Sequence, residues 1–525
     1  QRLTLVKIGS ELARAQIKPP TKLLAFIQTQ TTTFTLQEDE VVLLSSALQA
    51  GCVASGHTTP TYLDRFGSAG ADTLTGGEEE VLAAFLAHPK ALGDGAPNPF
   101  QRRAALGDAQ SSAAFGEAAL LGLVDDESAK PVYLNTHEPF CLVTVGVQGG
   151  GKSHTLGCVL ESCLLPAEPI VRLSSPHAAL VLHYDTSASS VCEATGLISP
   201  KQYGVQLPKD RMTVLVSPTF YHQRRAFYDG YCNVRPLLFK WSSLSADHLK
   251  RLMCVRPGDS QLYVAVLLDL LRQYQRNAKI PVFQDFDSEV RRMCNVPGQD
   301  GPLRQRLALL YSIIAESTVN AELADVAVDL SNVCATGNLV VVDLSDPMLS
   351  KDEANGIFTV LTEQFRTMDI QRCGGKLLVL DEAHKFMDGE AGNDDLSNAI
   401  VDVARLMRHD GMRLVVSTQS PKALAPELLE LLSVAVLHRF HSLDWLTYLA
   451  RKLPLERKKI WQLLMGLHPG QALVFTSLLA TSHPSMAEYQ CGRNVFPLRI
   501  RDRLTSDRGK TFTNVASKRK DRHMT

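Results

Sequence analysis

The stretch "FCLVTVGVQGGGKSHTLGCVLES", residues 140–162, places three consecutive glycines between an apolar run and a helical pattern. Its residues 146–153 fit the pattern G-x-x-x-x-G-K-[ST]. In that pattern a glycine-rich turn presents backbone N–H groups to a phosphate, and the helix that follows adds its positive N-terminus. The order of strand, turn and helix favours this interpretation over a chance glycine-rich turn. The stretch therefore predicts a nucleotide-binding loop in an α/β protein.

Each residue type in the loop suits a different part of a nucleotide. We expect Lys152 to reach the β- and γ-phosphates and Ser153 to ligate Mg²⁺. The other predicted nucleotide contacts are Gly146, Gly149, Gly150, Gly151 and His154. The predicted cofactors are accordingly ATP and Mg²⁺.

Length and composition restrict the class of protein. A chain of 525 residues is too long for one ordinary domain, and its formal net charge of -1 gives no general attraction to nucleic acid or membrane. The apolar runs are strand-sized, and we see neither a signal peptide nor a membrane span. The 11 cysteines are scattered singly, which favours reduced thiols in the cytoplasm or nucleus.

Changes in composition and residue patterning along the chain predict four regions. Residues 1–92 read as a mixed α/β region of uncertain fold, and residues 93–139, rich in Gly, Ala, Ser and Pro, as a linker or mobile loop. Residues 140–509 read as one ATPase domain with a helical insertion at about 219–337. Residues 510–525 read as a basic, disordered tail.

Short apolar, β-branched runs alternate with helical patterns throughout the third region. The expected strands are residues 140–145, 178–185, 211–218, 338–345, 376–382, 412–418, 434–440 and 470–477. Unbroken apolar strands are typical of a sheet buried on both faces. We therefore expect an α/β fold with a mostly parallel central sheet.

Two aspartates at strand ends compete for the magnesium role. Asp343 follows "LVVV" and precedes Leu344, which can do no proton chemistry, whereas Asp381 in "KLLVLDEAH" precedes Glu382. An adjacent acid can accept the proton of an attacking water. We therefore choose Asp381 as the magnesium ligand and Glu382 as the base. Gln419, at the end of "LVVSTQSP", is the predicted sensor that orients the water.

The letters "DEAH" invite comparison with superfamily 2 helicases, but other features disagree. No Q-x-x-G-R-x-G-R motif lies near the C-terminus, and 229 residues separate Lys152 from Asp381, a spacing longer than is usual in those helicases. ABC ATPases are excluded because the chain has no L-S-G-G-Q signature.

Seven stretches, in order, resemble the HerA–FtsK superfamily of ring-forming translocases, and its HerA branch in particular. They are "GKSHTLG" (151–157), "NLVVVDLS" (338–345), "LLVLDEAHKF" (377–386), "ARLMRHDGMRLVVSTQSP" (404–421), "LHRF" (437–440), "LHPGQALVF" (467–475) and "LRIRDRLT" (498–505). The resemblance implies a RecA-like P-loop ATPase that acts as a hexamer on DNA, with ATP bound between subunits. It also implies an arginine finger from the neighbouring subunit, for which Arg408 and Arg439 are the candidates.

The same resemblance leaves the partners open. Helicases of this branch act with a nuclease, and a nuclease or adaptor partner is one expectation. The HerA β-barrel is not apparent in residues 1–139. Candidate nucleic-acid contacts are the tail "KRKDRH" (518–523) with the arginines before it, "YHQRRAFY" (221–228) and "LARKLPLERKK" (449–459), although charged tails and helical faces usually just face water.

Three functions remain open from sequence. The first is a Mg²⁺-dependent ATPase motor that translocates on or unwinds DNA, and the second is a regulatory or scaffold ATPase that switches conformation without translocating. The third is a nucleotide binder without turnover, against which Lys152, Asp381, Glu382 and Gln419 all argue. His154 and His384 show no metal-ligand spacing with other histidines or cysteines.

Overall fold

The computed structural model describes residues 102–506 with short gaps and, before them, residues 2–4, 34–37 and 40–43. The gaps within 102–506 are 126–128, 256–258, 260, 278–280, 294–297, 299, 370–373, 389–394, 452, 454–456, 481–487, 490–491 and 494. The chain divides into two compact units, residues 1–87 and 88–525. In the first unit, β1 (Arg2–Thr4), β3 (Glu40–Leu43) and β2 (Phe34–Gln37) pair antiparallel in that order. The predicted tail at 510–525 and the rest of 1–92 lie outside the described residues.

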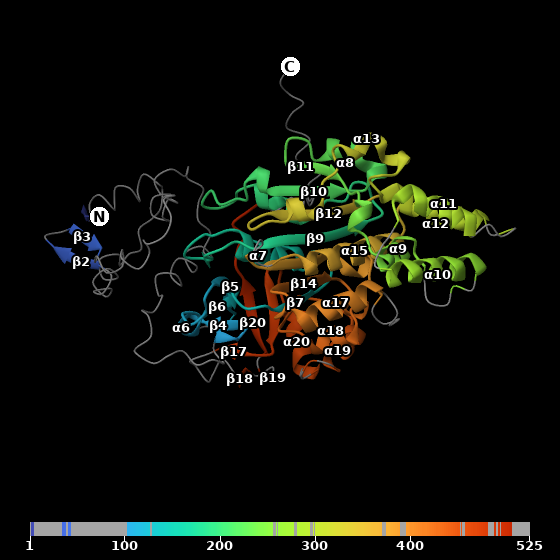
Figure 1. The fold of residues 1–525 in the computed structure, drawn as a ribbon. Coiled ribbons are helices and arrows are strands. Elements are labelled where there is room, and N and C mark those ends of the chain that lie inside the picture. Colours follow the sequence, from blue (N-terminus) through green and yellow to red (C-terminus); the bar gives the residue numbers. More distant parts are fainter. Residues whose placement is uncertain are drawn as a thin grey trace, which may run out of the picture. The chain divides into compact units, whose positions relative to one another are not determined.

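One 15-stranded sheet organises the second unit (Figure 1). Eight neighbouring strands run parallel, and their order across the sheet is β11 (Asn233–Pro236), β10 (Met212–Val216), β12 (Leu339–Ser345), β9 (Ala178–Asp185), β13 (Lys376–Asp381), β14 (Met412–Thr418), β7 (Cys141–Val145) and β15 (Val434–Leu437). Nearly all their residues are buried, as the unbroken apolar runs predict. The α/β class with a mostly parallel central sheet is therefore confirmed.

The sheet continues as an antiparallel extension beyond β15. Its strands are β16 (Gln471–Thr476), β20 (Val495–Ile500), β5 (Ala118–Val124), β6 (Pro131–Asn135) and β4 (Leu106–Asp108), followed by β17 (Leu479–Ala480), which pairs with β4 in parallel. The short β8 (Val171–Arg172) pairs with β5, and β18 (Glu488–Tyr489) with β19 (Gly492–Arg493).

This extension replaces the linker predicted for residues 93–139. From residue 102 onward, the described part of that region forms β4, α6 (Ala109–Ser112), β5 and β6, and every residue of β5 is buried. The glycines that suggested a mobile linker allow strands and side chains to pack closely instead. A Cβ on Gly122 would overlap the carbonyl of Arg499 in the paired strand β20, and one on Gly107 would lie 2.7 Å from the Phe115 ring.

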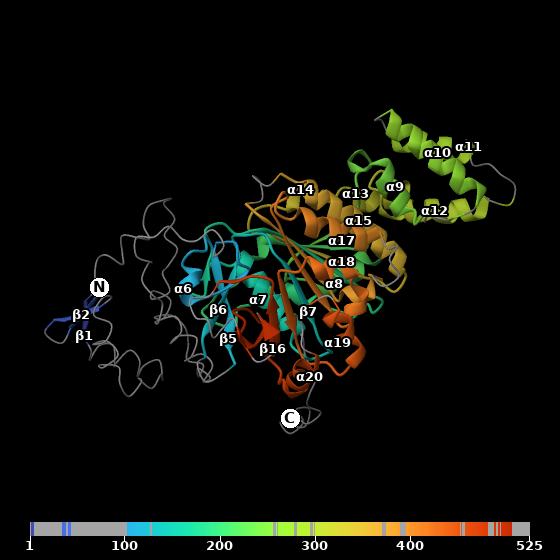
Figure 2. The ribbon, with the colours of Figure 1, turned by 90° about the horizontal axis from the view of Figure 1, so that it is seen from below.

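Helices cover both faces of the parallel part (Figures 1 and 2). Alternate strand residues, such as Val143 and Leu380, join one large apolar cluster with α15 (Lys351–Thr367) and α17 (Asp395–Leu406). The strand residues between them face α7 (Lys152–Leu164) on the other side. Beyond α17 the chain adds α18 (Pro426–Glu430), α19 (Leu443–Ala450) and α20 (Arg457–Gly466).

Residues 219–337 carry a run of helices with the edge strand β11 among them. They are α8 (Tyr221–Phe227), α9 (Ala246–Leu252), α10 (Leu262–Arg276), α11 (Phe283–Met293), α12 (Asp300–Ile313), α13 (Ala321–Ala324) and α14 (Leu330–Val333). Helices α10, α11 and α12 stand together at one end of the sheet (Figure 2). None of the helices in the described part is long and apolar enough to cross a membrane.

A buried ion pair fastens the segment after β20 onto α7. Arg501 lies 2.7 Å from the Glu161 carboxylate and also donates to the Cys158 carbonyl at 3.0 Å. The backbone N–H groups of Leu504 and Thr505 donate to the same carboxylate at 3.1 and 2.9 Å. Burial alone would raise the pKa of Glu161, but Arg501 and these hydrogen bonds hold it below its ordinary value.

We predict that Arg501→Met lowers the free energy of unfolding by about 3 kcal/mol, because it removes the closer of the two arginines that neutralise the buried Glu161 carboxylate and leaves only Arg503, at 3.7 Å. Urea unfolding measures the loss. The control is Arg276→Gln, which removes an exposed pair with Asp269 whose charged atoms lie 4.0 Å apart, and which should shift the midpoint far less. Equal, small shifts in both variants would contradict the importance of the buried pair.

Candidate nucleotide-binding site

The loop between β7 and α7 has the backbone conformation of an anion cradle. Gly149 and Gly151 have φ angles of 74° and 109°, in the left-handed region that side chains disfavour. Gly151 is also the N-cap of α7, where no side chain caps the helix. The first N–H groups of α7 are therefore available to a bound anion.

His438, which the sequence pattern did not single out, supports this loop. Its Nδ1–H donates to the carbonyl of Gln471 (3.2 Å), so its Nε2 accepts from the hydroxyl of Thr155 on α7 (2.9 Å). A Cβ on Gly146 would lie 2.7 Å from the His438 Cβ, and one on Gly151 3.0 Å from its Nδ1. Burial lowers the pKa of His438 to about 4, which keeps the ring neutral at pH 7.

Glu382 is held between Lys152 and Gln419 at the mouth of the loop. The Gln419 side-chain amide donates to Glu382 Oε2 at 2.7 Å, and Lys152 Nζ lies 3.8 Å from Oε1. Lys152 Nζ also donates to the Val147 carbonyl at 3.2 Å. Burial lowers the pKa of Lys152, and the carboxylates of Glu382 and Asp381 partly offset that effect. Three residues from distant parts of the sequence thus meet at one point.

The backbone at Glu382 is strained. Its φ of 53° and ψ of 44° put a non-glycine residue in the left-handed region, a conformation that costs about 1–3 kcal/mol. The turn breaks the alternation of β13, so Asp381 and its neighbour Glu382 both lie close enough to interact with the charge of Lys152. Such strain is concentrated at functional sites.

Asp381 fits the role of a magnesium ligand. Its Oδ2 lies 3.2 Å from His183 Nδ1, whereas its Oδ1 is buried without a hydrogen-bond partner. Ser153, the second residue of α7, is half-buried at the same edge of the sheet. Carboxylate and hydroxyl oxygens are the hard ligands that Mg²⁺ prefers, so these residues fit the ion.

Asp343, the competing aspartate, is fully committed elsewhere. It forms a buried ion pair with Arg224, accepts from Tyr228 Oη at 2.6 Å, and accepts from the hydroxyl and N–H of Ser345 at 2.6 and 3.1 Å. A carboxylate with this many partners has little capacity left for a metal ion. The geometry therefore supports the choice of Asp381 over Asp343.

The two candidate arginines lie at opposite ends of the parallel strands. Arg408 lies between α17 and β14, at the amino end of β14, whereas Arg439 follows the carboxyl end of β15. The backbone carbonyl of Arg439 accepts a hydrogen bond from Val147 of the loop at 3.2 Å. Both arginines are exposed. Arg408 therefore lies away from the edge of the sheet that carries the loop.

The histidines of the motifs contact protein groups. The His154 ring nitrogen Nε2 lies 2.8 Å from the Arg501 carbonyl, whereas the backbone N–H of His154, in the first turn of α7, remains available to a phosphate. His384 accepts from the Gln419 N–H at 3.4 Å and lies 3.6 Å from Glu382, and burial lowers its pKa. His384 therefore supports the groups around Glu382.

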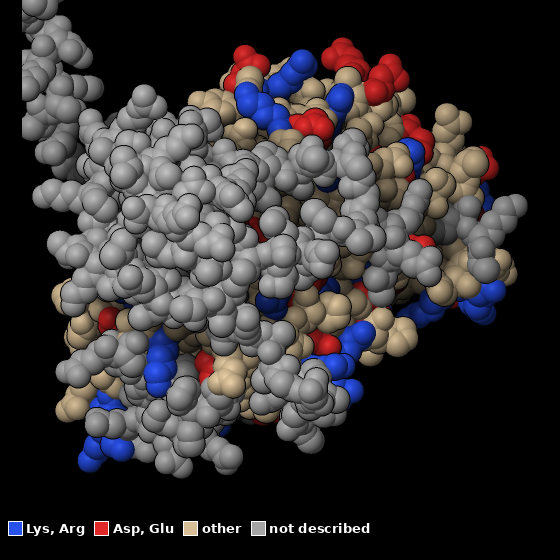
Figure 3. Space-filling view, turned by 90° about the vertical axis from the view of Figure 1, so that its left-hand side faces the viewer, with Lys and Arg blue, Asp and Glu red and all other residues tan. Residues whose placement is uncertain are grey.

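Several residues considered as nucleic-acid contacts are internal instead. Arg224 and Tyr228 of "YHQRRAFY" are bound to Asp343, and Arg501 and Arg503 before the tail are buried beside Glu161. On the face shown in Figure 3, the described basic and acidic side chains are interspersed and do not gather into a basic patch. The tail "KRKDRH" itself lies outside the described residues.

Comparisons with known proteins find distant likenesses. No protein-family model and no curated protein matches the chain. The plasmid coupling protein TrwB, in complex with a non-hydrolysable GTP analogue, matches with a TM-score of 0.42 and 13% identity over 71% of this chain and 88% of that one. VirB4 of Thermoanaerobacter pseudethanolicus matches with 0.40 and 14% over 73% and 96%. The genome packaging NTPase B204 of Sulfolobus turreted icosahedral virus 2, in complex with AMPPCP, matches with 0.28 and 10% over 64% and 92%. At these scores no functional detail carries over to this chain.

We predict that the free energy of unfolding falls as the pH drops from about 6.5 to 4, because His438 binds a proton less readily in the folded than in the unfolded state. The folded pKa of about 4 lies below the unfolded value, so this stability is complete above about pH 6.5 and is lost through the window. His438 contributes about 3 kcal/mol to this loss, and His177, whose pKa burial also lowers to about 4, adds to it in the same window. Chemical unfolding across this pH range checks it.

The matched variants are His438→Gln, which should reduce this pH dependence and leave the part due to His177, and His441→Gln, which removes an exposed histidine nearby and should preserve it in full. Only the slopes of unfolding free energy against pH are compared, because His438→Gln also changes the packing and so the absolute stability. An unchanged slope in His438→Gln would contradict the neutral, buried state of the ring.

Proposed function

We propose that this protein is a Mg²⁺-dependent ATPase motor of the HerA–FtsK type that forms a ring and translocates on DNA. The observation that carries the proposal is the position of Glu382 between Lys152 and Gln419 at the mouth of a glycine-rich loop. A carboxylate beside a phosphate-binding loop, oriented by an amide, is the arrangement that water activation requires.

The residues of the site divide the work of hydrolysis. The loop N–H groups and the start of α7 bind the phosphates, and Lys152 exchanges its contact with Val147 for the γ-phosphate. Gln419 donates to Glu382 through its amide nitrogen, which leaves its amide oxygen free to orient a water. Glu382 accepts the proton of that water. Ser153 and Asp381 would hold Mg²⁺, which would supply positive charge to neutralise the phosphates.

A ring explains where the transition-state arginine comes from. Arg408 lies at the edge of the sheet opposite to the loop, so in an assembly of subunits it would reach the site of its neighbour. Arg439 lies on the same edge as the loop and is the alternative. The resemblance to ring-forming translocases supports this proposal, with Arg408 as the preferred finger.

The alternative function is a regulatory ATPase that switches conformation without moving along DNA. It is favoured by the burial of Arg224, Arg501 and Arg503, which removes three residues that could have held a DNA backbone. Binding without hydrolysis is disfavoured because Lys152, Glu382 and Gln419 are assembled.

We predict that the purified protein hydrolyses ATP and that single- or double-stranded DNA raises the rate. Glu382→Gln should lower kcat by about 10²- to 10⁴-fold, because the amide cannot accept the proton. The control is Glu430→Gln, a change of an exposed glutamate at the end of α18, which should retain full activity. Steady-state phosphate release measures the rates of the wild type, with and without DNA, and of the two variants.

The outcomes separate the functions. Turnover that depends on Glu382 but is indifferent to DNA would replace the motor with the regulatory ATPase. Activity that survives Glu382→Gln would overturn the assignment of the base.

We predict that Arg408→Ala lowers turnover by about 10³-fold or more, and that activity returns when this variant is mixed with Lys152→Ala. In a mixed ring, a Lys152→Ala subunit supplies its intact arginine to the intact loop of an Arg408→Ala neighbour. Neither variant alone should recover. If mixing restores activity for Arg439→Ala but not for Arg408→Ala, Arg439 is the finger.

A further inference from the structure

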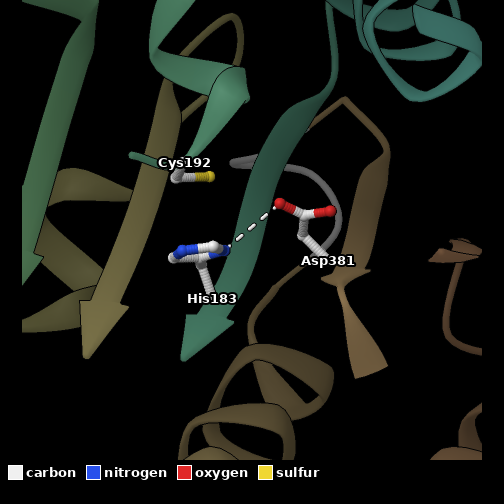
Figure 4. A group of neighbouring side chains, drawn as sticks. All are labelled: His183, Cys192 and Asp381. Carbon is white, nitrogen blue, oxygen red and sulfur yellow. Dashed lines mark hydrogen bonds and ion pairs between the residues drawn. The ribbon is translucent and has the colours of Figure 1, made fainter. Parts of the chain in front are cut away.

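A second group of side chains lies behind the proposed magnesium position. His183 near the end of β9, Cys192 just before a 3-10 turn (Glu193–Ile198) and Asp381 at the end of β13 face one another (Figure 4). One ligand atom from each, a ring nitrogen, the thiol sulfur and a carboxylate oxygen, lies within 4.8 Å of the other two.

These three groups are buried together. His183 is 3% exposed, Cys192 0% and Asp381 4%. Side chains with a nitrogen, a sulfur and a carboxylate oxygen gain little from shared burial unless a proton or a cation joins them. His183 Nδ1 and Asp381 Oδ2, at 3.2 Å, already share one proton in this structure.

The second ring nitrogen of His183 is also held. Its Nε2 lies 3.3 Å from the hydroxyl of Ser190, and Arg224 donates to the carbonyls of Ser190 and Ala188 at 3.0 and 2.8 Å. A metal-binding histidine characteristically donates its other N–H to a fixed acceptor. With Nε2–H bonded to Ser190, Nδ1 and the proton that it shares with Asp381 lie on the side of the ring that faces Asp381, and Nδ1 can bind an ion once that proton has left.

The donor set selects the kind of ion. A thiolate, an imidazole and a carboxylate suit Zn²⁺, whereas Mg²⁺ prefers oxygen ligands throughout. With the usual Zn–N, Zn–O and Zn–S bond lengths, a tetrahedral ion holds its ligand atoms about 3.3–3.6 Å apart. The 3.2 Å separation of His183 and Asp381 is close to this value, and Cys192, whose sulfur lies within 4.8 Å of both, needs to approach by at most about 1.3 Å.

We propose that His183, Cys192 and Asp381 form a binding site for a single Zn²⁺ ion, with a water molecule as the fourth ligand. On binding, the thiol gives up its proton and the proton between His183 and Asp381 is displaced, so the ion replaces a hydrogen bond with three metal–ligand bonds. The spacing of these residues in the sequence gave no such signal, because the site depends on the pairing of β9 with β13.

This ion and Mg²⁺ would use different oxygens of one carboxylate. Oδ2 of Asp381 faces His183, and Oδ1 is the oxygen without a hydrogen-bond partner. The zinc site does not depend on ATP hydrolysis, so a failure of the proposed function and a failure of this site are distinguishable. Its test measures the metal directly.

The experiment uses the full-length, metal-free protein and Co²⁺ as a spectroscopic probe for Zn²⁺. We expect one Co²⁺ per chain with a thiolate-to-metal charge-transfer band that Zn²⁺ removes and excess Mg²⁺ does not. Cys192→Ser should abolish the band and His183→Gln should weaken binding by more than about 100-fold. Ser190→Ala should weaken it by about 10- to 100-fold.

The matched control is Cys163→Ser, since Cys163 is equally buried on α7 but belongs to no such group among the described residues. A band that survives in Cys192→Ser, disappears equally in Cys163→Ser, or is removed by Mg²⁺ would overturn the proposal. Should Cys192→Ser fail to fold, X-ray absorption of the zinc-loaded wild type decides. One sulfur ligand per zinc is expected, and none or several would overturn the site.

Discussion

The parallel pairing of β9, β13, β14, β7 and β15 is the constraint on which the site depends. Parallel strands bring all their carboxyl ends to one edge of the sheet. The loop follows β7, Asp381 and Glu382 follow the core of β13, Gln419 follows β14 and His438 follows β15. Groups that lie hundreds of residues apart in the chain therefore converge without any local motif connecting them, at the edge where α/β sheets characteristically bind ligands.

Each buried charge around that edge is neutralised or hydrogen-bonded by a specific partner. Arg224 neutralises Asp343, Arg501 neutralises Glu161, and His183 bonds to Asp381. An unpaired charge in these places would be costly, so each partner fixes the orientation of the other. The consequence is rigidity: α7, which follows the glycine-rich loop, is held at Glu161 by the segment after β20, and at Thr155 by His438.

Asp381 joins two chemical environments through its two oxygens. One oxygen faces a buried histidine, and the other is buried without a hydrogen-bond partner. A carboxylate held on one side keeps its other oxygen in a fixed position, which lowers the reorganisation needed when a cation binds. The strained backbone of Glu382 fixes the adjacent carboxylate as well, because it turns the Glu382 side chain toward Lys152.

The sequence by itself determined the α/β class, the parallel sheet and the loop at residues 146–153, since these follow from local patterns of apolar runs and glycines. It also identified Glu382 and Gln419 as the groups to test, because polar residues at the ends of buried strands are visible in one dimension. It could not show that residues 102–139 extend the sheet, because small residues suit a linker and close strand pairing equally well. Only the tertiary structure decided that Arg224, Arg501 and Arg503 are internal, that His438 supports the loop, and that His183 and Cys192 meet Asp381. The reason is physical: an arginine or histidine pairs with whatever carboxylate or carbonyl folding brings within about 3 Å, and strand order, which local sequence does not encode, sets that neighbour.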